Sequence, residues 1–139
     1  MDNANVVDLL TNVDLFSGLS RKEINLLASN GRDIRHADGH AVLEEGGTAL
    51  GFHLILEGHA TVEMRGATVR EMGPGEYFGE MSLIDGKPRS ASVIAKGPMR
   101  TFFLNSTWFG KMLDEHPEVA RSVINGLCGR LRALEDRVN

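Results

Sequence analysis

The sequence contains one cysteine, Cys128, so the chain cannot form a disulfide with itself and suits a reducing compartment such as the cytoplasm. It has no apolar run of the length that crosses a bilayer, and its first ten residues carry no basic cluster, unlike a secretion signal. No basic face is obvious in the sequence, and acidic residues outnumber basic ones, so the net charge is −4 and the pI about 5.7. We therefore expect a cytoplasmic protein that binds neither membranes nor nucleic acid directly.

What the chain does have is enough length for one domain with a packed core: 139 residues, 42% of them hydrophobic and 24% charged. Its 16 glycines concentrate in the middle of the chain, where short apolar runs alternate with turn residues. This pattern predicts strands at residues 40–43, 52–56, 60–64, 68–72, 91–95 and 100–104. Many short strands about ten residues apart are typical of an antiparallel barrel or roll, rather than of a parallel βαβ sheet.

Both ends of the chain have helical spacing instead. Two short helices are predicted between residues 6 and 28, and Ser20 followed by Glu23 is a capping-box pattern that begins the second. After Asn105 one apolar face precedes Pro117, and a longer apolar stripe follows it; the stripe consists of Val119, Val123, Leu127, Leu131, Leu134 and Val138. Gly126 and Gly129 interrupt this last helix, either because it packs closely against a neighbour or because it has to bend.

One short segment gathers the groups that a small anion with hydroxyls would need. Gly79 precedes Glu80 and a predicted helical turn, and Arg89 and Ser90 follow the turn back toward a strand. The start of a helical turn offers free backbone N–H groups, a carboxylate accepts from hydroxyls, and an arginine fork matches a phosphate. From the residues alone, a simple ion pair between Glu80 and Arg89 is an equally good interpretation.

The same segment, FGEMSLIDGKPRSASV at residues 78–93, resembles the phosphate-binding cassette of cyclic-nucleotide-binding domains. LEEGG at 43–47, FHLILEGHATV at 52–62 and GPGEYFGE at 73–80 resemble the family's first glycine turn, its central hairpin and the approach to its cassette. The resemblance implies an α+β fold with an antiparallel β-roll or jelly roll. It implies a single domain over residues 1–139, with N-terminal helices in 1–34, the roll in 35–105 and two closing helices in 106–139.

The resemblance also assigns roles to residues. Gly79 brings its backbone close to a ribose, Glu80 accepts from the ribose 2′-hydroxyl, and Arg89 binds the cyclic phosphate. The other binding residues that it implies lie in the cassette, on the strands before it, or on the last helix: Phe78, Met81, Ser82, Ser90, Ala91, Val62, Val69, Arg70, Leu131, Leu134 and Glu135.

The expected function is a sensor or regulatory domain that binds cAMP in preference to cGMP and signals through its last helix. Ser90 does not decide between the two nucleotides, but Leu134 offers an apolar cover and no aspartate on that helix points clearly at a guanine. We expect no catalytic residue, no metal and no cofactor. A homodimer or a protein partner at the C-terminal helix is also expected.

Four alternatives are weighed against this expectation. A cupin enzyme would need a His-x-His pair, and the five histidines, His36, His40, His53, His59 and His116, contain none. A transcription regulator of the catabolite activator type would need a helix-turn-helix after the last helix, and a channel would need membrane helices before the domain. We expect room in this chain for neither a helix-turn-helix nor membrane helices. The transcription regulator therefore stays an alternative only if this chain is a fragment of one. A domain that no longer binds its ligand is disfavoured by the intact Glu80 and Arg89.

Overall fold

The computed structural model describes residues 3–46, 50–80, 82–85, 87 and 91–138. These residues divide into two compact units, one within Gly31–Gly110 and the other formed by Met1–Asn30 together with Lys111–Asn139. The first unit holds the strands and the second holds most of the helices.

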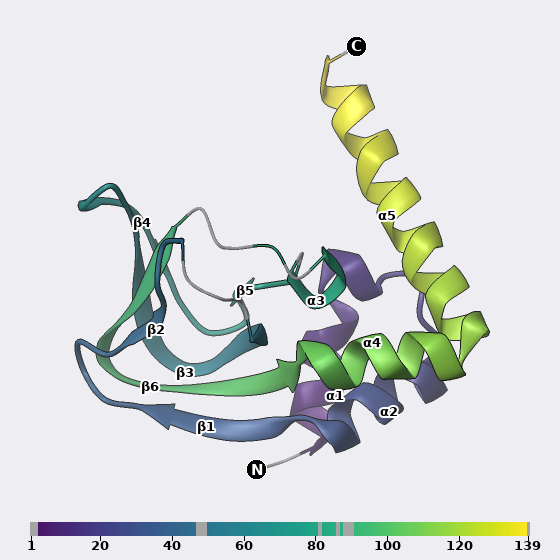
Figure 1. Cartoon of the computed structure of the whole chain (residues 1–139), viewed down its shortest axis with the longest axis horizontal. Helices are drawn as coiled ribbons and strands as arrows, with labels where there is room; N and C mark the ends of the chain where they lie inside the picture. Colours follow the sequence, from purple (N-terminus) through teal and green to yellow (C-terminus); the bar gives the residue numbers. More distant parts are fainter. Residues whose placement is uncertain (1–2, 47–49, 81, 86, 88–90, 139) are drawn as a thin grey trace. The chain divides into compact units, whose positions relative to one another are not determined.

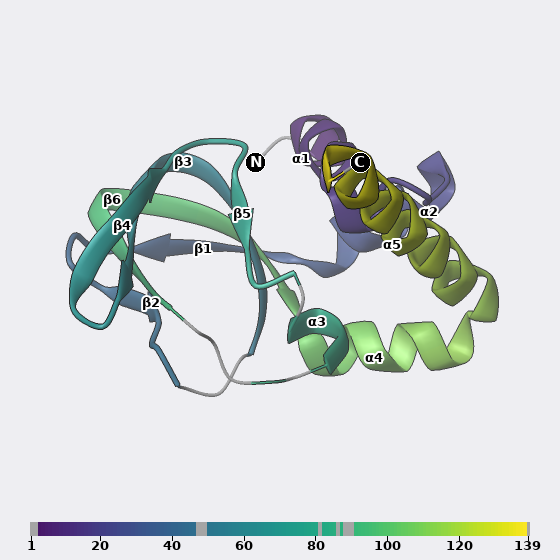
Figure 2. The same cartoon turned by 90° about the horizontal axis from the view of Figure 1, so that it is seen from above.

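The strand unit is a six-stranded sheet in which every recorded pairing is antiparallel. Four strands follow the order β1-β6-β3-β4, while β2 pairs with β6 and β5 pairs with β3. Figures 1 and 2 show β3 and β6 as long curved strands that run together through the sheet. The strands are β1 (Arg32–His36), β2 (Ala41–Leu43), β3 (Gly51–Met64), β4 (Ala67–Met72), β5 (Tyr77–Phe78) and β6 (Ser92–Asn105). The antiparallel β-roll that the sequence predicts is therefore confirmed.

The two longest strands correct the predicted boundaries, because each replaces a pair of expected strands. Residues 52–56 and 60–64 belong to the single strand β3, so the expected hairpin at 52–62 is wrong. The chain does not turn at Gly58 but forms a bulge, where φ is +86° and the register with β6 shifts. Arg100 supports this bulge, since its Nη1 lies 3.0 Å from the carboxylate of Glu57, the residue before Gly58. Residues 91–95 and 100–104 likewise fall along β6, apart from Ala91.

The sequence pattern did not predict two of the strands, β1 and β5. Strand β1 begins within the segment expected to hold N-terminal helices, and β5 is only two residues long. The pattern of β1 explains the omission, because only His36 among its five residues is buried. A strand with one buried residue lacks the alternation by which strands are found in a sequence.

The helical unit begins with α1 (Asn3–Thr11), a short 3-10 helix η1 (Asp14–Phe16) and α2 (Arg21–Asn30). The capping box is confirmed: the Ser20 N–H donates to the Glu23 carboxylate at 2.8 Å, and the Glu23 N–H donates to Ser20 Oγ at 3.2 Å. Helix α4 (Ser106–Glu115) follows β6, and α5 (Pro117–Val138) begins at the predicted proline. Within this unit α1 packs against α2, and α5 packs against η1.

Among the described side chains of the apolar stripe on α5, the buried ones lie in its first half. Val119 and Val123 are almost fully buried, whereas Leu131 and Leu134 are 60% and 48% exposed. Gly126 lies where α5 meets η1, since a Cβ on it would come 3.1 Å from the Leu15 carbonyl oxygen. The close-packing interpretation is thus confirmed for Gly126. It is wrong for Gly129, where an added Cβ would meet nothing within 4 Å.

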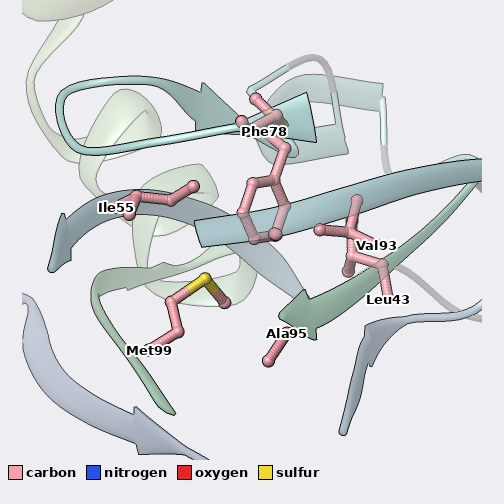
Figure 3. Packing of buried hydrophobic residues seen from close by; sticks show 8 residues of the cluster. Leu43, Ile55, Phe78, Val93, Ala95 and Met99 are labelled. Atoms are coloured by element: carbon pink, nitrogen blue, oxygen red, sulfur yellow. The ribbon is translucent and has the colours of Figure 1, made fainter. Parts of the chain in front are cut away.

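Inside the β-roll, one apolar cluster joins the strands on both sides of the cassette. Its buried members come from strands β2 to β6: Leu43, Ile55, Ala60, Met72, Phe78, Val93, Ala95 and Met99. Figure 3 shows the ring of Phe78 extending from β5 toward Ile55, Met99 and Val93. Burial of one such aromatic side chain contributes roughly 1.5–3 kcal/mol to stability, so Phe78 anchors the chain where the cassette begins.

Candidate ligand-binding site

A tight turn fixes the approach to the cassette. The Glu76 N–H donates to the Gly73 carbonyl at 3.1 Å, and Gly75 has φ +87°. Proline at the second position and a glycine with positive φ at the third are the signature of a type II turn. The turn is held against β3, because Ile55 exchanges backbone hydrogen bonds of 2.9 and 2.8 Å with Glu76 and Gly75. The turn predicted at 73–75 is confirmed.

Gly79 is the most constrained backbone position of the site. Its φ of +88° lies in the left-handed region, and a Cβ there would come 2.4 Å from the Gly51 carbonyl oxygen and 3.2 Å from Phe52 Cα. The chain after β5 therefore passes directly over the start of β3, with room for a hydrogen atom only. The next residue, Glu80, is half-buried and emerges from this crossing.

A single helical turn follows, as predicted. Helix α3 (Ser82–Asp85) buries Leu83 and leaves Ile84 47% exposed. The Asp85 carboxylate then accepts from the backbone N–H of Lys87 at 3.0 Å, which turns the chain as Asp commonly does. The cassette resumes as a strand at Ser92, whose hydroxyl accepts from the N–H of Glu45 at 2.8 Å.

The structure brings together only some of the predicted binding residues. Phe78 is buried, and Val62 packs on the same apolar cluster. Ala91 and Val62 are half-buried, and Val62 pairs across the sheet with Val93. Val62 on β3, Phe78 on β5 and Val93 on β6 therefore form one apolar wall, and Ala91 directly precedes β6.

Val69 and Arg70 lie on β4 and do not belong to this wall. Val69 is 53% exposed, and Arg70 is exposed, with its guanidinium 2.8 Å from the Glu76 carboxylate. Beside them on the surface, Lys96 donates to the Glu71 carboxylate, and this hydrogen bond lowers the pKa of Glu71. The edge formed by β4 is thus a charged, solvated surface.

Several predicted residues lie elsewhere. Met81, Arg89 and Ser90, and the side chain of Ser82, lie outside the described residues. Leu131, Leu134 and Glu135 are exposed on α5, which belongs to the helical unit. A contact between these α5 side chains and a ligand therefore stays a prediction.

Sequence analysis missed a polar group inside the roll. Thr101 is fully buried, and its Oγ1 lies 2.9 Å from His36 Nε2 and 3.0 Å from His53 Nδ1. Burial lowers the pKa of His36, and the neighbouring His40 lowers it further. The available signal was the position of His53, a polar residue inside the apolar run 52–56 of a predicted strand.

The histidines do not assemble into a metal centre where the structure describes them. Among the described residues, no group of three or more His, Cys, Asp or Glu side chains is placed to hold a metal ion. His53 is buried, whereas His59, six residues later on β3, is exposed. Across the same part of the chain, no helix combines the length and apolar character needed to span a bilayer.

The roll, the glycine crossing and the short helical turn define a small-ligand binding domain. Comparison with protein families matches residues 34–116, more than half of the chain, to the family described as cyclic nucleotide-binding domain. The chain belongs to the cyclic nucleotide-binding domain family, which is a family of regulatory binding domains.

Solved structures agree with this assignment. The N-terminal domain of a transcriptional regulator from Streptomyces coelicolor A3(2) is 26% identical, with a TM-score of 0.83 over 93% of this chain and 96% of that one. A cyclic nucleotide-binding-like protein from Brucella abortus is 25% identical, with a TM-score of 0.73 over 79% of this chain and 98% of that one.

A third structure is longer than this chain. It is a proposed cyclic nucleotide binding protein from Ruegeria pomeroyi DSS-3, 20% identical, with a TM-score of 0.83 over 99% of this chain. The chain spans 63% of that protein's length, and at 20% identity the likeness is one of fold.

Proposed function

We propose that this domain is a sensor that binds a cyclic nucleotide at residues 78–93, cAMP in preference to cGMP. The observation that carries the proposal is the crossing at Gly79, where a left-handed glycine against the start of β3 delivers the half-buried Glu80 to a short helical turn. Only a glycine backbone leaves space for a close approach at such a point. The family assignment supports the same ligand class.

Each group of the site has one task in this proposal. Glu80 accepts a hydrogen bond from the ribose 2′-hydroxyl, and Arg89 holds the cyclic phosphate with two parallel N–H donors. Ser82 and Ser90 add N–H or hydroxyl donors to the same phosphate. Hydrogen bonds to charged groups are worth roughly 1.5–3 kcal/mol each, so Arg89 and Glu80 both contribute substantially to the proposed affinity.

The choice of base depends on groups outside the cassette. The apolar wall of Val62 and Phe78 suits either purine, and Ser90 is compatible with both. Leu134, an apolar side chain on α5, is proposed as the cover of the base. This composition favours adenine.

Signalling is proposed to involve α5. A ligand shifts a conformational equilibrium only through its different affinity for the two states, so α5 must contact the ligand or the cassette in one state. Gly126 is packed against Leu15, whereas a Cβ added at Gly129 would meet no atom of the described residues within 4 Å. The segment after Gly126 is therefore the part of α5 with the fewest constraints on its movement.

Isothermal titration calorimetry tests the proposal with cAMP, cGMP and 5′-AMP as ligands. Wild-type protein is expected to bind cAMP most tightly and 5′-AMP least. Arg89→Ala is expected to weaken cAMP binding by about ten- to a hundred-fold, because a charged hydrogen bond of roughly 1.5–3 kcal/mol is lost.

Arg35→Ala is the matched control. Arg35 is an exposed arginine on β1, so its removal changes the net charge equally without touching the cassette. Unchanged affinity in Arg35→Ala is expected. Absence of cyclic-nucleotide binding by the wild type would contradict the function itself, and equal binding by Arg89→Ala would contradict the phosphate contact.

The second candidate function is the sensor half of a transcription regulator. The Streptomyces coelicolor structure favours it, because this chain matches 96% of the N-terminal domain of such a regulator. The mass of the native polypeptide distinguishes the two candidates. This chain accounts for 15.2 kDa, and a larger product with a helix-turn-helix would favour the regulator.

A further inference from the structure

A hydrogen-bonded link holds the strand that leaves the cassette. The backbone N–H of Glu45, just after β2, donates to the hydroxyl of Ser92 at 2.8 Å, and Ser92 is the first residue of β6. The carboxylate of the same Glu45 accepts from the backbone N–H of Arg65 at 2.9 Å. One residue therefore connects segments that lie 47 and 20 positions away from it in the sequence.

The pairing of the strands explains why the link matters at Ser92. On one side of β6, the ladder with β2 ends where Leu43 pairs with Val93, and the Ser92 hydroxyl extends the connection by one residue. On the other side, Ser92 pairs with Glu63 on β3. The start of β6 is thus attached to both neighbouring strands, three residues after Arg89 in the sequence.

The partner of the Glu45 carboxylate is the tip of the β3–β4 hairpin. Met64 pairs with Ala67, so Arg65 and Gly66 form a two-residue turn, and their φ angles are +54° and +79°. Two positive φ angles are the pattern of a type I′ turn. In the described part of the chain, Arg65 is the only residue other than glycine with a positive φ, which a side chain with a Cβ disfavours. The hydrogen bond to its N–H therefore stabilises a strained turn.

These contacts limit the freedom of the segment that enters β6. A segment that is already held in place loses less conformational freedom when a ligand binds. The apparent affinity for the ligand decreases in proportion to the fraction of molecules in the competent conformation. Both hydrogen bonds of Glu45 are exposed to solvent, where a hydrogen bond is weaker than in the interior. Loss of one of them should therefore lower this fraction without abolishing binding.

We propose that Glu45 is a positioning residue for the cyclic phosphate. By joining Ser92 to the tip of the β3–β4 hairpin, it holds the start of β6 and thereby restricts Arg89, which precedes this strand. The proposal rests on the proposed function, because Arg89 needs positioning only if it binds a phosphate. Glu45 acts through its accepting oxygen, and its negative charge is not required.

The test is the dissociation constant of cAMP, measured by isothermal titration calorimetry at pH 7.5. Glu45→Ala removes the acceptor and is expected to weaken binding by about three- to ten-fold, as the competent fraction falls to roughly a third to a tenth. Glu45→Gln keeps an accepting oxygen without the charge and should restore most of the affinity. Glu44→Ala is the matched control, because Glu44 is an exposed neighbour of the same charge, and it should bind like the wild type.

A double-mutant cycle with Arg89 distinguishes positioning from general stabilisation. If Glu45 acts through Arg89, Glu45→Ala should reduce the affinity much less in an Arg89→Ala background than in the wild type. A merely structural role predicts the same fold-loss in both backgrounds. Should Arg89→Ala bind too weakly for the measurement, Arg89→Lys takes its place, because lysine keeps the charge but not the paired donors.

The outcomes separate the two proposals. If Glu45→Ala binds cAMP as tightly as the wild type, or loses affinity equally in both backgrounds, the positioning role is overturned and the proposed function stands. The same holds if Glu45→Gln is as weak as Glu45→Ala, since the charge would then be responsible. If the wild type binds no cyclic nucleotide, the proposed function fails and the positioning role fails with it. Should Glu45→Ala not fold, Ser92→Ala removes the other hydrogen bond and should show the same loss and the same coupling to Arg89.

Discussion

At the scale of single residues, two glycines of the β-roll have similar backbone angles but different surroundings. Gly79 has φ +88° and Gly39 has φ +81°, so alanine is strained at both. A Cβ on Gly39 would meet nothing within 4 Å, whereas one on Gly79 would meet the Gly51 carbonyl oxygen at 2.4 Å. Backbone at that distance cannot move aside without displacing the start of β3.

We therefore expect Gly39→Ala to reduce the free energy of unfolding by roughly 1–2 kcal/mol, the strain of a left-handed alanine. Gly79→Ala should reduce it by more, and should also weaken cAMP binding, because the crossing positions Glu80. Urea denaturation followed by circular dichroism measures the first effect, and calorimetry the second. Equal destabilisation by the two substitutions would show that the close approach at Gly79 is relieved easily.

At the scale of elements, α5 contains two glycines three residues apart that the structure distinguishes. An added Cβ at Gly129 has open space, whereas one at Gly126 would lie 3.1 Å from the Leu15 carbonyl and 3.3 Å from Ser17 Oγ. Replacing glycine by alanine inside a helix stabilises it by about 1 kcal/mol when nothing else changes.

Gly129→Ala is accordingly expected to raise the free energy of unfolding by about 0.5–1 kcal/mol. Gly126→Ala should raise the free energy of unfolding by less than Gly129→Ala, or lower it. The reason is that η1 must move by a few tenths of an ångström to make room for the added Cβ. Thermal unfolding of the two variants side by side measures the difference. A larger gain for Gly126→Ala than for Gly129→Ala would mean that α5 and η1 are not in close contact.

At the scale of the whole molecule, the buried histidine gives stability a dependence on pH. The pKa of His36 is lowered from its usual 6.5 chiefly by burial, so the unfolded chain binds this proton more readily than the folded one. A group of this kind leaves stability unaffected above its unfolded pKa, and stability decreases as the pH falls below it.

The free energy of unfolding is expected to fall as the pH decreases from 6.5, the unfolded pKa of His36, toward 5. Urea denaturation at a series of pH values measures this decline. His36→Gln should have a flatter profile in that window, and His59→Gln, at an exposed position, should follow the wild type. A decline that begins only near the pKa of ordinary carboxyl groups would assign acid sensitivity to those groups instead.

The sequence by itself determined the roll, the helices at both ends, the capping box at Ser20 and the turn before the cassette. These features depend on local patterns, such as alternation, helical spacing and the preference of proline and glycine for particular angles. The order of residues in the chain also predicts Gly79 and Glu80 as binding residues, and that role stays a prediction.

Only the tertiary structure decided that β3 and β6 are continuous strands, because glycine occurs in the sequence at a bulge and at a turn alike. The pairing of β1 was likewise decided only by the tertiary structure. The same limit applies to the contact of Gly79 with Gly51, the difference between Gly126 and Gly129, and the meeting of His36, His53 and Thr101. Each of these joins residues that are distant in sequence, in some cases by 48 or 65 positions. No local pattern specifies such contacts, since they arise only when strands pair and the roll closes.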